Sequence, residues 1–205
     1  MDDFPSQTFS KPHAAGAKPT AHSFCSVPSL KRTGMQLEKI PPFKNELINV
    51  IIETPRGSRY KYSYDEEQEV FKLKKTLPLG STFPFDFGFI PNTHAEDGDP
   101  IDVLVVMDEP AYPGIVVTCR LIGVLEAKQK ERNGTVTRND RIVAVAERSV
   151  LYAEVKHLGD LSETMEDQIA RFFINYNEQA GKEFTPLRWS DAAAAQELIK
   201  QGSKV

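Results

Sequence analysis

From Leu47 onward, short apolar runs alternate with turn residues, a pattern that predicts a series of β-strands. The predicted strands cover residues 47–53, 59–65, 70–73, 101–107, 115–125 and 135–146. Between the last two lies Asn133-Gly134, a dipeptide that favours a two-residue type I′ hairpin turn. With that turn, Arg141 is expected to face Glu126 across the hairpin, and Asp140 to point to the other side.

Toward the C-terminus the apolar positions recur at three- and four-residue steps, which predicts helices. One apolar stripe runs from Leu161 to Tyr176, with Ser162 as a candidate N-cap and Gly181 as the stop. A second helix is predicted over residues 192–200. Strands followed by helices predict a mainly β fold with helices packed to its side.

The first 43 residues differ in composition from the rest of the chain, with many Pro, Ser, Ala and Lys residues and little periodicity. We predict that residues 1–43 form a flexible tail and residues 44–205 a single domain. An organelle transit peptide is the alternative for the tail. The early Asp2 and Asp3 and the scarcity of arginine argue against it.

Charge and cysteine content narrow the class of protein. The formal net charge of −4 argues against a nucleic-acid partner and against a polybasic membrane anchor. No apolar run approaches the length needed to cross a membrane. Cys25 and Cys119 form neither a disulfide framework nor a metal-binding spacing, which fits a reducing cytoplasm.

Three aspartates, Asp97, Asp99 and Asp102, fall within six residues and precede the apolar run 103–106. Alternate side chains of an extended segment share a face, and Pro100 favours an extended Asp99, so Asp97 and Asp99 are expected to lie close together. Oxygen donors of this kind suit Mg²⁺ or Mn²⁺. The plainer alternative is an acidic surface turn.

Residues 96–105 resemble the signature of the soluble family I inorganic pyrophosphatases. Segments similar to the family flank it in the same order at 50–55, 61–62, 83–91 and 172–176, and the resemblance spans about residues 47 to 200. It implies a five-stranded, OB-like antiparallel barrel, the pyrophosphatase fold. It also implies a homo-oligomeric cytoplasmic enzyme, an inorganic diphosphatase that uses Mg²⁺, or Mn²⁺ instead, to hydrolyse inorganic diphosphate to two phosphates.

The same resemblance implies the roles of individual residues. Asp97, Asp102 and Glu53 would bind metal, and Asp99 would be the base that accepts a proton from the attacking water. Four residues would contact the phosphate groups of the substrate: Lys61, Lys75, Arg141 and Tyr176.

Structural alternatives remain open for several of these residues. Glu53 fits equally a surface carboxylate at a strand end, and Lys61 a solvated charge on an edge strand. Arg141 fits a cross-strand ion pair with Glu126. Tyr176 fits ordinary core packing on the helical stripe.

The sequence also departs from the family pattern. Ser63 stands where a glutamate is usual, Phe87 where a tyrosine is usual, and Asn177 where a lysine is usual. Lys75 stands where the family usually has arginine, and Arg141 where it has lysine. Asn139 stands where a further metal-binding aspartate is expected. The candidates to replace that aspartate are Asp140, Glu126 and Glu131.

Two other functions are compatible with these departures. One is a phosphohydrolase with an altered substrate preference, since Phe87 and Asn177 remove a hydroxyl and a cation that would select small, highly charged diphosphate. The other is a non-catalytic pyrophosphatase-like scaffold, such as an OB-type binding module. The net negative charge opposes oligonucleotide binding by such a module.

Overall fold

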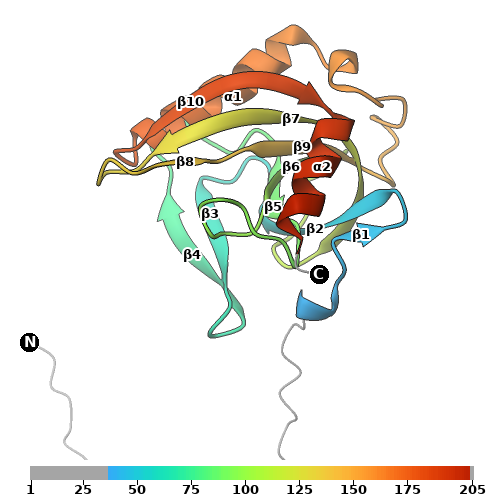
Figure 1. Ribbon diagram of the computed structural model, residues 1–205, viewed down its shortest axis with the longest axis horizontal. Helices are drawn as coiled ribbons and strands as arrows, with labels where there is room; N and C mark the ends of the chain where they lie inside the picture. The colour runs from blue at the N-terminus through green and yellow to red at the C-terminus, as the bar shows by residue number, and fades with distance from the viewer. Residues whose placement is uncertain (1–36, 204–205) are drawn as a thin grey trace, which may run out of the picture. The chain divides into compact units, whose positions relative to one another are not determined.

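The structure is a computed structural model that describes residues 37–203 (Figure 1). The predicted tail therefore lies outside the described residues up to residue 36. Within the described part, a short 3₁₀ helix η1 (Leu37–Lys39) precedes strand β1 (Phe43–Lys44). Secondary structure is thus present on both sides of residue 44, where we placed the start of the domain.

Five strands pair into a closed ring in the order β2, β5, β6, β9, β7, with β7 returning to β2. Their bounds are β2 (Leu47–Thr54), β5 (Asp86–Phe89), β6 (Asp102–Val106), β7 (Val116–Lys130) and β9 (Arg141–Ala146). The expected mainly β, five-stranded OB-like barrel is confirmed. Four of the five pairings are antiparallel, but β6 and β9 run parallel, so their first residues lie at the same end of the barrel.

The remaining strands extend the barrel or stand beside it (Figure 1). β8 (Val136–Arg138) and β10 (Glu183–Asp191) both pair with β7, and β3 (Tyr60–Asp65) and β4 (Val70–Thr76) form a separate hairpin. β10 was not predicted. The predicted strand 135–146 is divided into β8 and β9, because the Asp140 carboxylate accepts the backbone N–H of Ala127 at 3.0 Å and interrupts the ladder.

The turn between β7 and β8 differs from the predicted two-residue turn. The backbone N–H of Glu131 donates to the carbonyl of Thr135 at 2.8 Å, which leaves residues 132–134 as a three-residue connection. Gly134 has a φ of +86°, the left-handed conformation that such connections place at their last residue. The Asn-Gly dipeptide therefore identified the hairpin correctly, but it forms part of a three-residue connection and not of a two-residue turn.

The extra loop residue moves the register by one position, which places different side chains opposite each other. Arg141 lies opposite Leu125, so the expected pairing of Arg141 with Glu126 is wrong. Glu126 instead forms ion pairs with Arg138 at 2.9 Å and Arg188 at 2.8 Å.

Two helices cover two of the three apolar clusters in the described part of the chain. α1 (Glu163–Glu178) begins at Ser162, whose hydroxyl accepts the N–H of Met165 as expected for an N-cap, and buries Phe173. α2 (Ala192–Gly202) is capped by Asp191 and buries Ile199 in the other cluster. A second short 3₁₀ helix, η2 (Leu158–Asp160), precedes α1. Within residues 37–203, neither helix is both long and apolar enough to cross a membrane.

Candidate active site

The first residues of β6 and β9 bring Asp102 and Arg141 together. The parallel register pairs Val103 with Ile142, so the residues immediately before them meet at the barrel end. Nη1 of Arg141 lies 2.8 Å from Oδ2 of Asp102. The guanidinium packs over the ring of Phe173, with its Cζ 5.0 Å from the ring centroid. The parallel pairing of β6 with β9 thus brings together a carboxylate and a guanidinium that are distant in the sequence.

Arg141 is almost completely enclosed by protein atoms, with 5% of its surface exposed. Its Nη1 also donates to the side-chain oxygen of Asn139 and, at 2.8 Å, to the backbone carbonyl of Asp140. Its Nε is buried and has no hydrogen-bond partner among the described residues. An unpaired buried donor of this kind is costly in free energy.

Glu53 and Lys61 form a second ion pair. Nζ of Lys61 lies 2.6 Å from Oε2 of Glu53, and the two side chains are 13% and 10% exposed. The other oxygen of Glu53 accepts the N–H of Tyr64 at 2.8 Å, and Nζ of Lys61 lies 4.1 Å from the ring centroid of Phe87. Glu53 is therefore not a surface carboxylate, and Lys61 is not a solvated charge.

Lys75 lies opposite Lys61 across the β3–β4 hairpin, and its Nζ is 3.4 Å from the ring centroid of Tyr176. Burial, followed by the charges of Lys182 and Lys61, lowers the pKa of Lys75 to about 8. Burial also raises the pKa of Tyr176, and the charge of Asp102 acts in the same direction. The Tyr176 ring thus packs in the aromatic cluster and lines the charged site as well.

Asp97 and Asp99 occupy the loop that leads into β6. The N–H of Ala95 donates to the carbonyl of Asp99 at 2.8 Å, and the N–H of Asp99 donates to Oδ1 of Asp97 at 3.2 Å. Gly98 between them has a φ of +91°, which few other residues adopt readily. Desolvation raises the pKa of Asp97, and the charge of Asp99 adds to this, so the two carboxylates lie near each other as expected.

The carboxylates of the site repel one another. The pKa of Asp102 is raised to about 6, chiefly by burial; the charges of Arg141 and Lys61 oppose this shift, and those of Glu53 and Asp97 add to it. The carboxylates of Glu53 on β2 and Asp97 on the loop before β6 are therefore close enough to Asp102 to affect its pKa. A divalent cation would relieve this repulsion.

The donor set fits such a cation. It consists of oxygens only, which hard divalent ions prefer. In the described part of the chain, no three His, Cys, Asp or Glu side chains already converge as a metal-binding group. Mg²⁺ commonly keeps several waters and uses one or two carboxylates together with substrate phosphates, so the residues present are compatible with it.

The candidate replacements for the aspartate absent at position 139 are already paired with cations. Asp140 lies 2.6 Å from Arg138, and Glu131 lies 2.8 Å from Lys182. Glu126 forms ion pairs with Arg138 and Arg188. Asn177, at another of the divergent positions, is buried and donates to the carbonyl of Phe173 at 2.9 Å, so its amide is used within its own helix.

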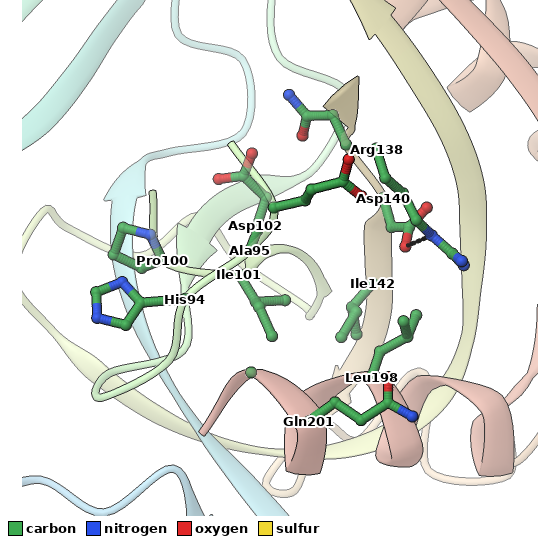
Figure 2. A pocket seen from close by; sticks show the side chains of 13 residues that line it. His94, Ala95, Pro100, Ile101, Asp102, Arg138, Asp140, Ile142, Leu198 and Gln201 are labelled. Atoms are coloured by element: carbon green, nitrogen blue, oxygen red, sulfur yellow. Dashed lines mark hydrogen bonds and ion pairs between the residues drawn. The ribbon is translucent and has the colours of Figure 1, made fainter. Parts of the chain in front are cut away.

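A cavity of about 300 Å³ adjoins the site at Asp102. In Figure 2 the ion-paired Asp140 and Arg138 lie above Ile142 and Leu198, and His94 and Pro100 lie across from them. Sequence analysis did not identify this cavity, because it forms where α2 meets two loops that are distant in the chain.

A closed barrel that gathers carboxylates and cationic side chains at one end is the arrangement of a metal-assisted enzyme for phosphorylated substrates. Residues 50–205 match the family model described as inorganic pyrophosphatase. The chain is 40% identical over 168 residues to the inorganic pyrophosphatase of Synechocystis sp., which covers 82% of this chain and 96% of that protein. The chain therefore belongs to the inorganic pyrophosphatase family, which implies a divalent metal cofactor.

Solved structures agree with this assignment. The inorganic pyrophosphatase of Thermus thermophilus superimposes with a TM-score of 0.73 at 33% identity, covering 80% of this chain and 94% of that one. The inorganic pyrophosphatase of Neisseria gonorrhoeae gives a TM-score of 0.74 at 29% identity, covering 81% and 95%.

Proposed function

We propose that this chain hydrolyses inorganic diphosphate to two phosphates, with Mg²⁺ as its metal and Asp99 as its base. The diphosphatase activity follows from membership of the family. The observation that best supports the site is the meeting of Asp102 and Arg141 at the barrel end that also holds Lys61 and Lys75.

The acidic side chains are proposed to hold the metal and to receive the proton of the attacking water. Asp97, Asp102 and Glu53 would bind the metal, which would neutralise phosphate oxygens and lower the pKa of a bound water. Asp99 is exposed on its loop beside Asp97, where its carboxylate can take the proton of that water. The water oxygen then forms a bond to one phosphorus while the bridging P–O bond breaks.

The cationic side chains are proposed to bind the two phosphate groups. Arg141 supplies a positive charge beside Asp102 at the barrel end and is proposed to bond a phosphate oxygen. Lys61 and Lys75 supply positive charge from the adjacent hairpin, and the hydroxyl of Tyr176 supplies a further donor. Together they would stabilise the charge that develops on the leaving phosphate.

A phosphate-release assay on the purified full chain tests this proposal. Inorganic diphosphate with Mg²⁺ should yield phosphate, and Mn²⁺ should support a comparable or lower rate. No phosphate release with any of several divalent metals would reject the function. A faster reaction with phosphate esters or nucleoside diphosphates would instead support the alternative substrate preference, while EDTA should abolish either activity.

We also propose that the chain forms homo-oligomers in the cytoplasm. Val150 and Leu151 are neighbours in the chain and are each at least 75% exposed, and contiguous exposed apolar side chains mark protein interfaces. Light scattering coupled to size-exclusion chromatography should report a multimer, and Val150→Asp with Leu151→Asp should shift it to a smaller species. A monomeric wild-type chain would refute the oligomer, and cell fractionation tests the location.

A further inference from the structure

The end of helix α2 is bonded to the base of the acidic loop, which we define as residues 94–101. The N–H of His94 donates to the carbonyl of Gly202 at 2.7 Å. The next pair of residues, Thr93 and Ser203, forms an antiparallel β-bridge. The chain that leads into the candidate metal ligands is therefore joined to the far end of the domain sequence.

The contact at position 202 requires a residue without a side chain. A Cβ there would lie 2.6 Å from the carbonyl oxygen of His94 and 2.8 Å from Cδ1 of Ile101. The first of these atoms belongs to the backbone, so no side-chain rotation could relieve the overlap and the loop would have to move. Gly202 thus lets α2 approach the first and the last residue of the acidic loop at once.

On the helix side this contact is fixed. The carboxylate of Asp191 caps α2 by accepting the N–H of Ala194 at 2.9 Å, and Ala195 and Ile199 are completely buried. Beyond the helix, the hydroxyl of Ser203 donates to the carbonyl of Ile199 at 2.6 Å. The end of α2 is therefore a firm support for the loop.

On the loop side the contact is passed on to the carboxylates. Ala95, the residue after His94, donates its N–H to the carbonyl of Asp99 at 2.8 Å and accepts the N–H of Gly98 at 3.1 Å. The N–H of Asp99 in turn donates to Oδ1 of Asp97 at 3.2 Å. A displacement of the backbone at His94 would therefore be transmitted to both aspartates.

Elsewhere the loop and the helix are partly separated. The cavity of about 300 Å³ is lined by Pro100 and Ile101 of the loop and by Leu198 and Gln201 of α2. In Figure 2 Ile101 lies above the helix that carries Leu198 and Gln201. Open space therefore replaces packed side chains along part of this boundary, which leaves more of the support to the direct contact at Gly202.

We propose that Gly202 is a positioning residue for the metal-binding carboxylates, because its close contact with His94 and Ile101 holds the acidic loop in the conformation that binds a divalent cation. The inference rests on the proposed function in that it takes Asp97 and Asp102 as metal ligands. Its consequence is that α2, which supplies no metal ligand itself, determines how tightly the metal is bound.

The test is a titration of the full chain with Mn²⁺ in the absence of diphosphate, with free Mn²⁺ measured by electron paramagnetic resonance. Gly202→Ala should bind Mn²⁺ about tenfold more weakly than wild type, the lower end of the effects seen when groups that orient metal ligands are changed. The Mg²⁺ concentration that gives half-maximal phosphate release should rise by a similar factor. Saturating Mg²⁺ should restore kcat to within about twofold, a rescue that general structural damage would not show.

Two control variants separate positioning from a loss of stability. Gln201→Ala changes the neighbouring, exposed residue of α2 and should alter Mn²⁺ affinity by less than about twofold. Ile122→Val removes a methyl group from a side chain that is 1% exposed in the other apolar cluster, so it should lower the urea midpoint and leave Mn²⁺ binding unchanged. Equal weakening in Ile122→Val and Gly202→Ala would overturn the proposal, as would unchanged binding in Gly202→Ala.

A measurement on the wild type covers the case in which Gly202→Ala does not fold. If the contact favours metal binding, metal binding must favour the contact by the same factor. Saturating Mg²⁺ should therefore slow hydrogen exchange of the His94 amide by at least about threefold. The amide of Glu147, which bonds the carbonyl of Thr118 beyond the far end of β9, should not change. Exchange at His94 that Mg²⁺ does not slow would refute the inference.

Failure of this inference and failure of the proposed function give different results. An active wild type whose Gly202→Ala variant binds Mn²⁺ as tightly as wild type would leave the function standing and refute the positioning role. A wild type that binds Mn²⁺ more tightly than Gly202→Ala, but releases no phosphate from diphosphate, would support the positioning role and reject the function.

Discussion

The unusual pKa of Lys75 predicts how the activity falls at alkaline pH. Its pKa is lowered to about 8 because the amine is partly buried against Tyr176 and lies near the charges of Lys182 and Lys61. At pH 9 only about one tenth of the free enzyme would carry the charge on Lys75. If Lys75 binds phosphate, kcat/KM should therefore decrease about tenfold per pH unit above pH 8.

The matched variant is Lys75→Arg, which keeps the charge at every pH of interest and can stack on the same ring. The ratio of kcat/KM between wild type and Lys75→Arg cancels the titration of diphosphate and of its metal complexes. We expect this ratio to change by less than about twofold from pH 6.5 to 7.5 and to decrease by about fivefold between pH 8 and 9. Removing a neighbouring charge with Lys182→Met should move the decrease to higher pH.

The lowered pKa of Lys75 also determines how its contribution to the free energy of unfolding changes with pH. The folded pKa lies below the unfolded value of 10.5, so between about pH 8 and 10.5 the unfolded chain binds more protons at this position. The contribution of Lys75 to the free energy of unfolding therefore rises with pH through that window and is least favourable below pH 8. A flat kcat/KM ratio between wild type and Lys75→Arg up to pH 9.5 would contradict the combination of a phosphate contact by Lys75 with a pKa of about 8.

Three further substitutions test the site and the barrel. Asp99→Asn should lower phosphate release by about 10² to 10⁴-fold with little change in the free energy of unfolding, and the adjacent Glu96→Gln should retain activity; equal effects would contradict the role of Asp99 as base. Gly88→Ala would place a Cβ 2.1 Å from the carbonyl oxygen of Ile51, so we expect destabilisation of about 1 to 3 kcal/mol in urea unfolding, and an equally stable variant would contradict the close approach of β5 and β2 at Gly88. Phe173→Ala removes a side chain that is 1% exposed and should cost about 3 to 5 kcal/mol in the same assay, with the half-exposed Ile174→Ala as a control near zero.

Local sequence patterns predicted most of the strands and both helices, because these depend on periodicity within one segment. Ser162 as N-cap and the run from Leu47 were recognisable for this reason. β10 was missed because it contains Pro186 and is mostly exposed, so it has no clear alternation of apolar residues. The closure of β7 onto β2, which pairs Ile48 with Cys119, depends on contacts that no local pattern reveals.

The candidate site was predictable only as a set of residues. The motif around Asp97 to Asp102 indicated a cation-binding end, and the resemblance supplied Lys61 and Lys75 as partners. The position of Arg141 was mispredicted, because Asn133-Gly134 favours a two-residue turn but here ends a three-residue connection, and one residue decides which side chains face each other.

The parallel pairing of β6 with β9 has a consequence for how the protein is made. During synthesis the acidic loop leaves the ribosome about forty residues ahead of Arg141. Its carboxylates therefore meet the ions of the surrounding solution before they meet the arginine. The ion pair between Asp102 and Arg141 therefore forms only after β9 has been synthesised, although the acidic loop is present earlier.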